Sequence, residues 1–365
     1  MVESQRLPEG TVRMEPERAR AFISAAFGAS GVDTDAAALV ADVLVSADLR
    51  GIRSHGMARM GYFLSRLERG TVNPSPSMRF ERGTHTTGVL HADDAIGIVA
   101  ADRGMHEALA MAAEHGSGFV TIRDSSHFGY AGYWAMEAMQ HGCIGISCSS
   151  GGRRVAPTFG TESVFGTNPL SVTVPGFGRA DDFVLDMATS AVAVGKVETA
   201  VREGRAVPEG WVVADDGPPT LDANDTLTYA NPLLPLGGAG DESGGHKGYG
   251  LSLAVELLAG ALGGSSLEER IAGASGDERT AMGHFMGAIS VPGFSDPETV
   301  GAAMARTFAL VRGSAVEPGR DRILVHGEPE RLAETENRRL GVAVTPPVLA
   351  QLRRWNERLE LGFDL

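Results

Sequence analysis

The stretch TIRDSSHFGYAGYWAME, residues Thr121–Glu137, begins like a buried strand and ends like a helix. Two serines, a histidine, an aromatic residue and a glycine lie at the junction. Enzymes with open sheets bind ligands at such junctions, where a strand ends and a helix starts. The helix N-terminus disfavours an imidazolium and so lowers the pKa of a histidine placed there. From this stretch alone, His127 is explained equally well as a catalyst or as a cap of the turn.

Strand and helix patterns alternate along most of the chain. Helical periodicity fills residues 15–70, the turn-forming run NPSPS interrupts it at 73–77, and strands then alternate with helices to about residue 328. The tail from Pro329 is helical again. We therefore expect a mixed α/β (α+β) protein. Residues 1–75 and 329–365 should form a helical lobe, and residues 76–328 an α/β region that binds cofactor and substrate.

Three later segments carry specific predictions. KGYGLSLAVELLAGALGG, residues 247–264, is apolar nearly all round and predicts a buried helix. SAVAVGKVETAVREG, residues 190–204, predicts another helix, and SSLEERIAGASGDERT, residues 265–280, is typical of a polar surface loop.

Composition and charge exclude several function classes. The formal net charge of −14 repels phosphate backbones, so neither a nucleic acid nor a membrane surface is an expected partner. The start MVESQRLPEG lacks an apolar stretch and no run approaches eighteen apolar residues, so neither a signal peptide nor a membrane span is expected. Cys143 and Cys148 fall on opposite faces of one predicted strand, which argues against a disulfide between them. We expect a cytoplasmic protein.

The sequence lacks the usual fingerprints of nucleotide and metal sites. The nearest approach to a Rossmann glycine motif is GAGDES at Gly238–Ser243, which has serine in place of the third glycine and follows a poor strand. The sequence contains no Walker A motif, no H-E-x-x-H and no C-x-x-C. His85 and His91 lie near one predicted strand without neighbouring ligand residues. We therefore expect no metal site.

Two polar motifs suggest anion binding. In RSHGMARM, residues 53–60, helical spacing places His55 and Arg59 on one face, where a guanidinium can grip a carboxylate and an imidazole can exchange a proton. A capped helix start with a solvated arginine explains the same pattern. In GHKGYG, residues 245–250, Lys247 and a helix N-terminus could hold a cofactor phosphate. The alternative is a glycine-rich turn with a surface lysine.

Three further motifs lie at strand ends. Asp186 in FVLDMATS could orient a histidine or bind a ribose hydroxyl, or could be satisfied by backbone near a helix cap. FGTNPL, residues 165–170, predicts a tight turn in which Pro169 holds Asn168 extended. HGEPE, residues 326–330, follows a strand and could be another helix-start site. Plain structural turns explain the last two motifs as well.

Taken in order, SHG with Arg59, SSHFG, FGTNPL, DMATS, GKV, KGYGL and GEPE resemble the malate/L-lactate dehydrogenase family of the second type. The resemblance covers roughly residues 15–345. It implies a non-Rossmann cofactor domain on a largely antiparallel sheet, joined to a helical lobe. It also implies an oxidoreductase that uses NAD or NADP, and a homodimer with active sites near the subunit interface.

The resemblance implies site residues position by position. His55 and His127 match the proton-transfer candidates, and Arg59 matches the residue that holds the substrate carboxylate, with Ser54 and Thr167 beside the substrate. The serine that contacts the cofactor in some members corresponds to Ser150, to its neighbour Ser149 or to neither. The other implied cofactor positions are Asp186, Met187, Ala188, Lys247, Gly248, His326, Gly327 and Glu328.

The implied reaction is hydride transfer between nicotinamide and C2 of a small 2-oxo or 2-hydroxy acid. One of the two histidines would protonate the developing alkoxide while the other hydrogen-bonds the substrate. We favour His127 for the proton, with Asp186 fixing its tautomer, and expect His55 to matter more if the substrate is a cyclic imine. The alternatives are a ketimine reductase that forms a cyclic L-amino acid and a ligand-binding relative without catalysis.

Overall fold

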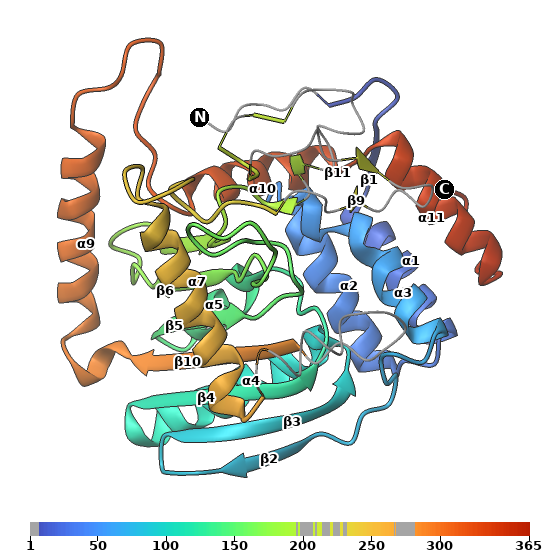
Figure 1. Ribbon diagram of the computed structural model, residues 1–365, viewed down its shortest axis with the longest axis horizontal. Coiled ribbons are helices and arrows are strands. Elements are labelled where there is room, and N and C mark those ends of the chain that lie inside the picture. Colours follow the sequence, from blue (N-terminus) through green and yellow to red (C-terminus); the bar gives the residue numbers. More distant parts are fainter. Residues whose placement is uncertain are drawn as a thin grey trace.

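A seven-stranded sheet lies at the centre of the protein (Figure 1). The computed structural model describes residues 7–194, 196, 197, 207, 208, 210–213, 220, 221, 227, 228, 232–265, 267 and 282–365. The strands, in their order across the sheet, are β2 (Arg79–Arg82), β3 (Thr87–Ala95), β4 (Ser117–Ser125), β10 (Met282–Ser290), β5 (Cys143–Ser149), β6 (Leu170–Val174) and β7 (Phe183–Met187). Only β3 and β4 pair in parallel, so the predicted α/β class with a largely antiparallel sheet is confirmed.

Helices cover both faces of this sheet. On one face lie α4 (Gly97–His115) and α5 (Ala131–Gln140), while α7 (Gly245–Ala259) crosses the opposite face (Figure 1). The approach of α4 depends on a glycine: a Cβ on Gly104 would lie 2.5 Å from the Ile122 side chain. Close packing of this kind fixes α4 against β4, whose C-terminal end carries the SSHFG turn.

The two ends of the chain pack together beside the sheet. The N-terminal segment supplies β1 (Val12–Met14), α1 (Pro16–Ala29), α2 (Thr34–Leu49) and α3 (Met60–Glu68), and the C-terminal segment supplies α10 (Glu328–Leu340), β11 (Val342–Val344) and α11 (Pro346–Arg358). Strand β1 pairs with β11, and Asn337 donates a hydrogen bond to the Leu49 carbonyl at the end of α2. One buried core runs from these helices into α4 and β4 without interruption.

Five further elements lie outside the main sheet and the helices described so far. They are the paired strands β8 (Thr220–Leu221) and β9 (Leu227–Thr228), the 3-10 turns η3 (Ala261–Gly263) and η4 (Val291–Gly293), and the projecting helix α9 (Pro297–Arg312) (Figure 1). No helix in the described part of the chain is both long and apolar enough to cross a membrane. Both cysteines are buried and unpaired, as the strand alternation predicts.

Two local predictions are wrong. Helix α7 is not buried all round, because it lies on the surface of the sheet and leaves Leu251 and Leu257 exposed. Asn168 is not extended: its φ of +37° is left-handed, a conformation that asparagine tolerates and that its side chain stabilises through bonds to Gly151 and Ser252. The predicted helix at 190–204 and the predicted loop at 265–280 lie largely outside the described residues.

Candidate active site

The segment after α2 carries His55 and Arg59 on two short 3-10 turns, η1 (Arg53–His55) and η2 (Met57–Arg59). The Ser54 hydroxyl lies 2.9 Å from His55 Nδ1, and the Ser54 carbonyl accepts a hydrogen bond of 2.8 Å from Arg59 Nε. The α-helical spacing predicted for this pair is therefore wrong, because the backbone here is too tightly wound and breaks at Gly56. Ser54 instead orients both side chains.

A buried carboxylate that the sequence analysis missed holds this segment. Asp48 in the last turn of α2 accepts a hydrogen bond of 2.7 Å from the backbone N–H of Met57. Gly56 packs directly on that carboxylate, since a Cβ there would lie 2.1 Å from Asp48 Oδ1. Burial raises the pKa of Asp48 to about 7, although the Met57 N–H and the Arg53 charge oppose the rise. Asp48 thus caps η2 from nine residues away.

The turn between β4 and α5 carries His127. Ser126 anchors it: its hydroxyl donates to the Ala95 carbonyl at 3.0 Å and accepts from the Gly97 N–H at 2.9 Å. The Gly129 N–H donates to His127 Nδ1 at 3.1 Å. Gly129 has a φ of +82°, and a Cβ there would lie 2.7 Å from the Val43 side chain, so the fold requires glycine at this position.

The two histidines face one another across this junction. Their ring centroids are 5.5 Å apart, and Tyr62 and Phe63 of α3 each contact the His127 ring edge-on at 5.8 Å. Burial lowers the pKa of His55 to about 3, assisted by the Arg59 charge. Burial, His55 and Arg59 hold the pKa of His127 well below its usual range. Both imidazoles are therefore neutral at pH 7 before an anion binds.

Hydrogen bonding determines which nitrogen of His127 carries the proton. Because Nδ1 accepts the Gly129 N–H, the proton of the neutral ring belongs on Nε2. The ring then offers a donor and not an acceptor. This arrangement speaks against His127 as the carrier of the transferred proton, which the sequence analysis favoured.

Asp186 does not fix the tautomer of His127, contrary to the sequence-based expectation. Its carboxylate receives the backbone N–H of Gly132 at the start of α5, and a Cβ on Gly132 would lie 2.7 Å from Asp186 Oδ2. Burial raises the pKa of Asp186 to about 6, and the Gly132 N–H partly offsets that rise. The side chain therefore joins β7 to the start of α5.

Three predicted cofactor segments border the edge strand β7. Met187 and Ala188, at its end, are half-buried. The Val184 N–H donates to the His326 carbonyl at 3.3 Å, which places the HGEPE turn beside β7. The Leu236 N–H donates to the Thr189 carbonyl at 2.9 Å and brings the start of α7, with exposed Lys247, to the same strand.

Other predicted positions are engaged in packing. The hydroxyl of Ser150, which is 1% exposed, donates to the Gly283 carbonyl. Glu328 is buried and pairs with Arg312 and Arg322 at 2.9 Å each. A Cβ on Gly248 or Gly327 would collide with a neighbouring segment, and the Thr167 carbonyl accepts from Thr189.

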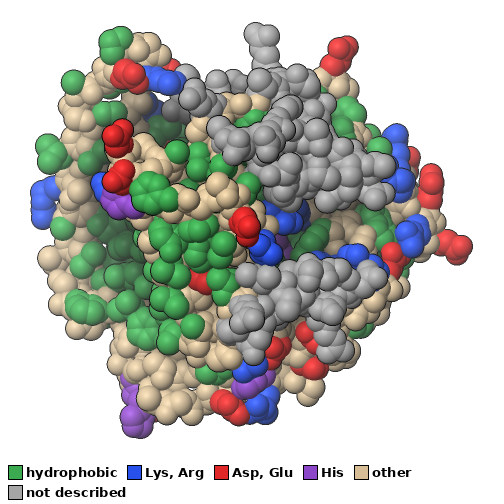
Figure 2. Space-filling view, viewed as in Figure 1, with side chains coloured by type: hydrophobic (Ala, Val, Ile, Leu, Met, Phe, Trp, Pro, Cys, Tyr) green, Lys and Arg blue, Asp and Glu red, His purple; other side chains and the backbone are tan. Residues whose placement is uncertain are grey.

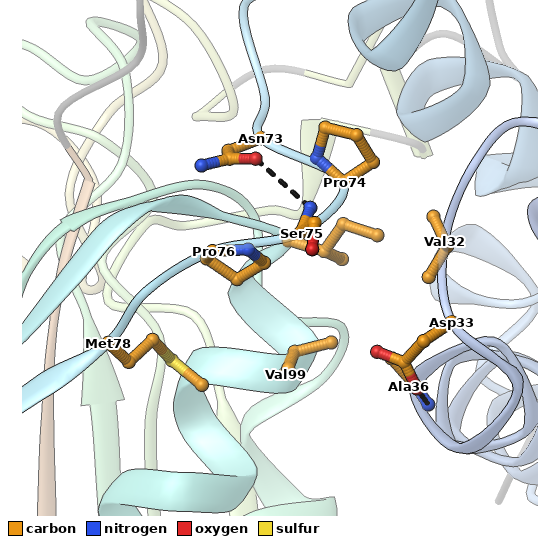
Figure 3. Close-up of a pocket in the computed structure, with 10 residues that line it drawn as sticks. Val32, Asp33, Ala36, Asn73, Pro74, Ser75, Pro76, Met78 and Val99 are labelled. Atoms are coloured by element: carbon orange, nitrogen blue, oxygen red, sulfur yellow. Dashed lines mark hydrogen bonds between the residues drawn. The ribbon is translucent and has the colours of Figure 1, made fainter.

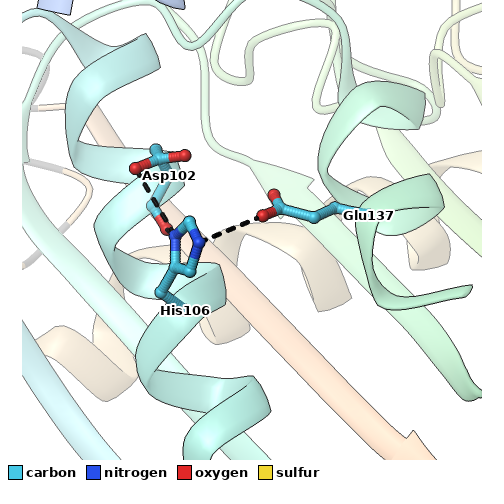
Figure 4. A group of neighbouring side chains, drawn as sticks. All are labelled: Asp102, His106 and Glu137. Carbon is cyan, nitrogen blue, oxygen red and sulfur yellow. Dashed lines mark hydrogen bonds and ion pairs between the residues drawn. The ribbon is translucent and has the colours of Figure 1, made fainter. Parts of the chain in front are cut away.

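A second titratable cluster lies between α4 and α5, formed by Asp102, His106 and Glu137 (Figure 4). His106 Nδ1 is 3.5 Å from the Asp102 carboxylate and Nε2 is 3.4 Å from that of Glu137. Burial raises the pKa of Glu137 to about 7. The two ring nitrogens face different carboxylates, so the imidazole bridges Asp102 and Glu137.

A crevice of about 120 Å³ opens between the start of α2, the 73–78 segment and the start of α4 (Figure 3). Pro74, Pro76, Met78 and Val99 supply much of its wall. The charged residue in its lining, Asp33, accepts hydrogen bonds from two N–H groups of α2 and serves as the helix cap. The lining includes neither histidine of the candidate site.

Comparison with known proteins adds an independent line of support. A family model described as malate/L-lactate dehydrogenase matches residues 14–353. The chain is 34% identical to the malate dehydrogenase of Pyrococcus abyssi, with 98% of each chain aligned. It is 31% identical to the ureidoglycolate dehydrogenase (NAD(+)) of Escherichia coli over 88% of this chain and 90% of that protein.

The fold comparison agrees. The solved malate dehydrogenase of Pyrococcus horikoshii superposes with a TM-score of 0.88 at 34% identity, covering 100% of this chain and 99% of the other. The two chains therefore share one fold over nearly their whole length. With the family match across nearly all of the sequence, these findings show that the protein belongs to the malate/L-lactate dehydrogenase family.

Proposed function

We propose that the protein transfers hydride between the nicotinamide of NAD or NADP and C2 of a small 2-hydroxy or 2-oxo acid. Its family makes it an oxidoreductase. The observation that carries the proposal is the pair of neutral histidines whose rings lie 5.5 Å apart beside Arg59. A substrate placed there would meet one cation for its carboxylate and two imidazoles for its C2 oxygen.

Arg59 is proposed to bind the carboxylate. Its hydrogen bond within the described part of the chain runs from Nε to the Ser54 carbonyl, which leaves the two terminal nitrogens of the guanidinium for a bidentate pair. A bound carboxylate would also raise the pKa of both histidines towards neutrality by partly cancelling the Arg59 charge.

The two histidines are proposed to have different roles. His127 would donate a hydrogen bond from Nε2 to the C2 oxygen and polarise it, as a neutral imidazole can. His55 would exchange the proton, because a proton on Nδ1 facing Ser54 leaves Nε2 free as an acceptor when a hydroxy acid is oxidised. Reduction reverses the transfer.

The residues along β7 are compatible with a dinucleotide. The half-buried strand end at Met187 and Ala188 offers a partly accessible surface, and the exposed Lys247 at a helix N-terminus offers an anion site. His326, exposed beside Phe183, would flank the same strand. When bound, the cofactor supplies or accepts the hydride. The E. coli relative named for NAD supports NAD as the first cofactor to test.

A substrate panel tests this function. Malate, lactate, sulfolactate and their 2-oxo acids would be assayed with both cofactors at two pH values, next to cyclic imino acids such as piperideine-2-carboxylate. Turnover of a 2-oxo acid supports the proposal, and turnover of the imines alone would favour the ketimine reductase. Failure of NADH and NADPH to bind, measured by fluorescence titration, would instead indicate a non-catalytic relative.

We also propose a cytoplasmic homodimer. Helix α7 and the turn after it expose Leu251, Leu257 (52% exposed) and Leu262 (61% exposed), and hydrophobic side chains gather over α7 on this face (Figure 2). Apolar patches of this kind commonly become subunit interfaces. Light scattering should give twice the chain mass, and Leu257→Glu should shift it towards the monomer. Leu332→Glu, at an equally exposed leucine of α10, is the control.

A further inference from the structure

A buried histidine lies directly beneath the turn that carries His127. His284 is fully buried on β10, the central strand between β4 and β5. Its Nε2 lies 2.9 Å from the Ser125 hydroxyl at the end of β4, and its Nδ1 lies 2.8 Å from the Ser149 hydroxyl at the end of β5. The imidazole thus bridges both neighbouring strands at the edge where the candidate site begins.

His284 contacts residues that lie on both sides of His127 in the sequence. Ser125 precedes His127 by two residues, and Phe128 follows it and stacks on the His284 ring, with centroids 4.7 Å apart and planes 8° from parallel. Ser126, which anchors the turn, lies between these two contact residues in the sequence. The residues on either side of the Ser126–His127 pair therefore both rest on one side chain.

The bridge is compatible with a neutral ring. A neutral imidazole donates at one nitrogen and accepts at the other, so it can serve one serine hydroxyl in each way. Ser149 can donate onward to the Gly283 carbonyl, at 3.3 Å. Burial lowers the pKa of His284 to about 3, so the ring stays neutral through the range in which enzymes operate. It adds no charge beneath the site.

We propose that His284 is a positioning residue for the proposed reaction: it holds the β4–α5 turn so that His127 keeps its Nδ1 on Gly129 and presents Nε2–H to the substrate. The inference rests on the proposed function for its kinetic consequence but not for its structural one. The plainer reading is a core histidine that only ties three strands together. That reading predicts lost stability without any effect on His127.

Two substitutions of His284 each keep one of its two serine hydrogen bonds and remove the other. In His284→Asn the amide reaches the place of Nδ1 and keeps Ser149, whereas in His284→Gln it reaches the place of Nε2 and keeps Ser125. Displacing a catalytic group by about 1 Å can cost roughly a hundredfold in rate. We expect kcat to fall roughly tenfold or more in the Asn variant and less in the Gln variant, with the KM for cofactor changed by less than about threefold.

A milder pair keeps the test valid if those variants fold poorly. Ser125→Ala deletes the hydroxyl on the side of the turn. Thr173→Val deletes a buried hydroxyl on β6 that donates to the Ala135 carbonyl and does not touch the turn. We expect kcat to fall only in Ser125→Ala. Equal kcat in the Asn and Gln variants, or an equal fall in Thr173→Val and Ser125→Ala, would overturn the inference.

NMR of isotope-labelled histidine gives a readout that needs no turnover. The His127 signals, assigned with His127→Gln, should report the Nε2–H tautomer in the unaltered protein and a mixture of tautomers in Ser125→Ala. Unchanged signals would refute the positioning role even if kcat fell. If the unaltered protein reduced no substrate and yet the signals moved, the proposed function would fail and the role of His284 would stand.

Discussion

The two segments that bring histidines to the candidate site are held in opposite ways. The His127 turn rests on a sheet, through the Ser126 anchor and the stacked His284, and none of these contacts involves a charged group. The His55 segment is two short 3-10 turns whose backbone is tied to α2 by one buried carboxylate, Asp48. One support is built from many neutral contacts and the other depends on a group that can gain or lose a proton.

This difference matches the roles proposed for the two rings. A hydrogen-bond donor must point in one direction throughout the reaction, which a turn fixed by the sheet provides. A proton carrier must change its charge, and a segment supported by Ser54 and by a capping carboxylate has fewer contacts to lose when it does so.

The largest expected effect concerns the histidines themselves. His55→Gln removes the proton carrier and should lower kcat by about 10²–10⁴-fold. His127→Gln should cost less, because a glutamine amide can place an N–H near the position of Nε2. Single-turnover hydride transfer, followed by NADH absorbance, measures both. A larger loss of kcat in His127→Gln than in His55→Gln would show that His127 carries the transferred proton, and the roles proposed for the two histidines would have to be exchanged.

The second largest effect is expected from a substitution that crowds the His127 turn. A Cβ on Gly97 would lie 2.0 Å from the Ser126 carbonyl oxygen and 2.5 Å from that of His127, so backbone must move. We expect Gly97→Ala to destabilise the fold by about 2–3 kcal/mol and to lower kcat as well. The matched control is Gly28→Ala in α1, where nothing lies within 4 Å and alanine should stabilise by up to about 1 kcal/mol. Urea denaturation of both variants compares them, and an unaffected Gly97→Ala would show that the turn is less rigid than proposed.

The His127 turn could be predicted from the sequence better than the His55 segment. The strand and helix around His127 follow from hydrophobic periodicity, and β4 (Ser117–Ser125) and α5 (Ala131–Gln140) form where the pattern places them. The 3-10 turns at His55 could not be predicted in this way, because three residues are too short to show a period. The spacing argument for His55 and Arg59 assumed an α-helix that does not form.

Partners distant in the sequence were also beyond prediction. His284 lies 159 positions from Ser125, and a histidine in an apolar strand gives no sign of which hydroxyls it will meet. The left-handed Asn168 depends on bonds to Gly151 and Ser252 that only the tertiary structure supplies. The motifs at Asp186, Lys247 and His326 each lie at the end of a strand or the start of a helix, which is where open-sheet enzymes bind ligands. Their positions beside β7 are therefore easier to anticipate from the sequence than the partners of His284.

A pH experiment tests the titratable support of the His55 segment. The pKa of Asp48 in the folded protein, about 7, lies above its unfolded value, so the folded protein binds a proton that the unfolded chain releases. The stability from this proton is fully present below about pH 4 and is lost as pH rises through about 7. Asp48→Asn removes that loss while keeping an acceptor for the Met57 N–H. Relative to the unaltered protein, the variant should gain about 2 kcal/mol between about pH 5 and pH 8 in urea denaturation.

The control for this experiment lies on the other segment. Ser126→Ala removes the anchor of the His127 turn without removing a titratable group, so it should cost the same stability at both pH values. If Ser126→Ala showed the pH dependence and Asp48→Asn did not, the two supports would have been assigned to the wrong segments.

The smallest expected effect separates substrate binding from the support of the segment. Arg59→Lys keeps the positive charge but loses both the bidentate fork and the Nε–H that binds the Ser54 carbonyl. We expect KM for the acid substrate to rise about tenfold, with kcat reduced less, because the lost contact is made with the carboxylate before and during reaction. Steady-state kinetics with a 2-oxo acid and with its ester sharpen the result, since the ester lacks the charge that Arg59 binds and should be nearly indifferent to the change. If the acid lost no affinity, Arg59 would serve only to brace Ser54, and the carboxylate site would have to be sought elsewhere.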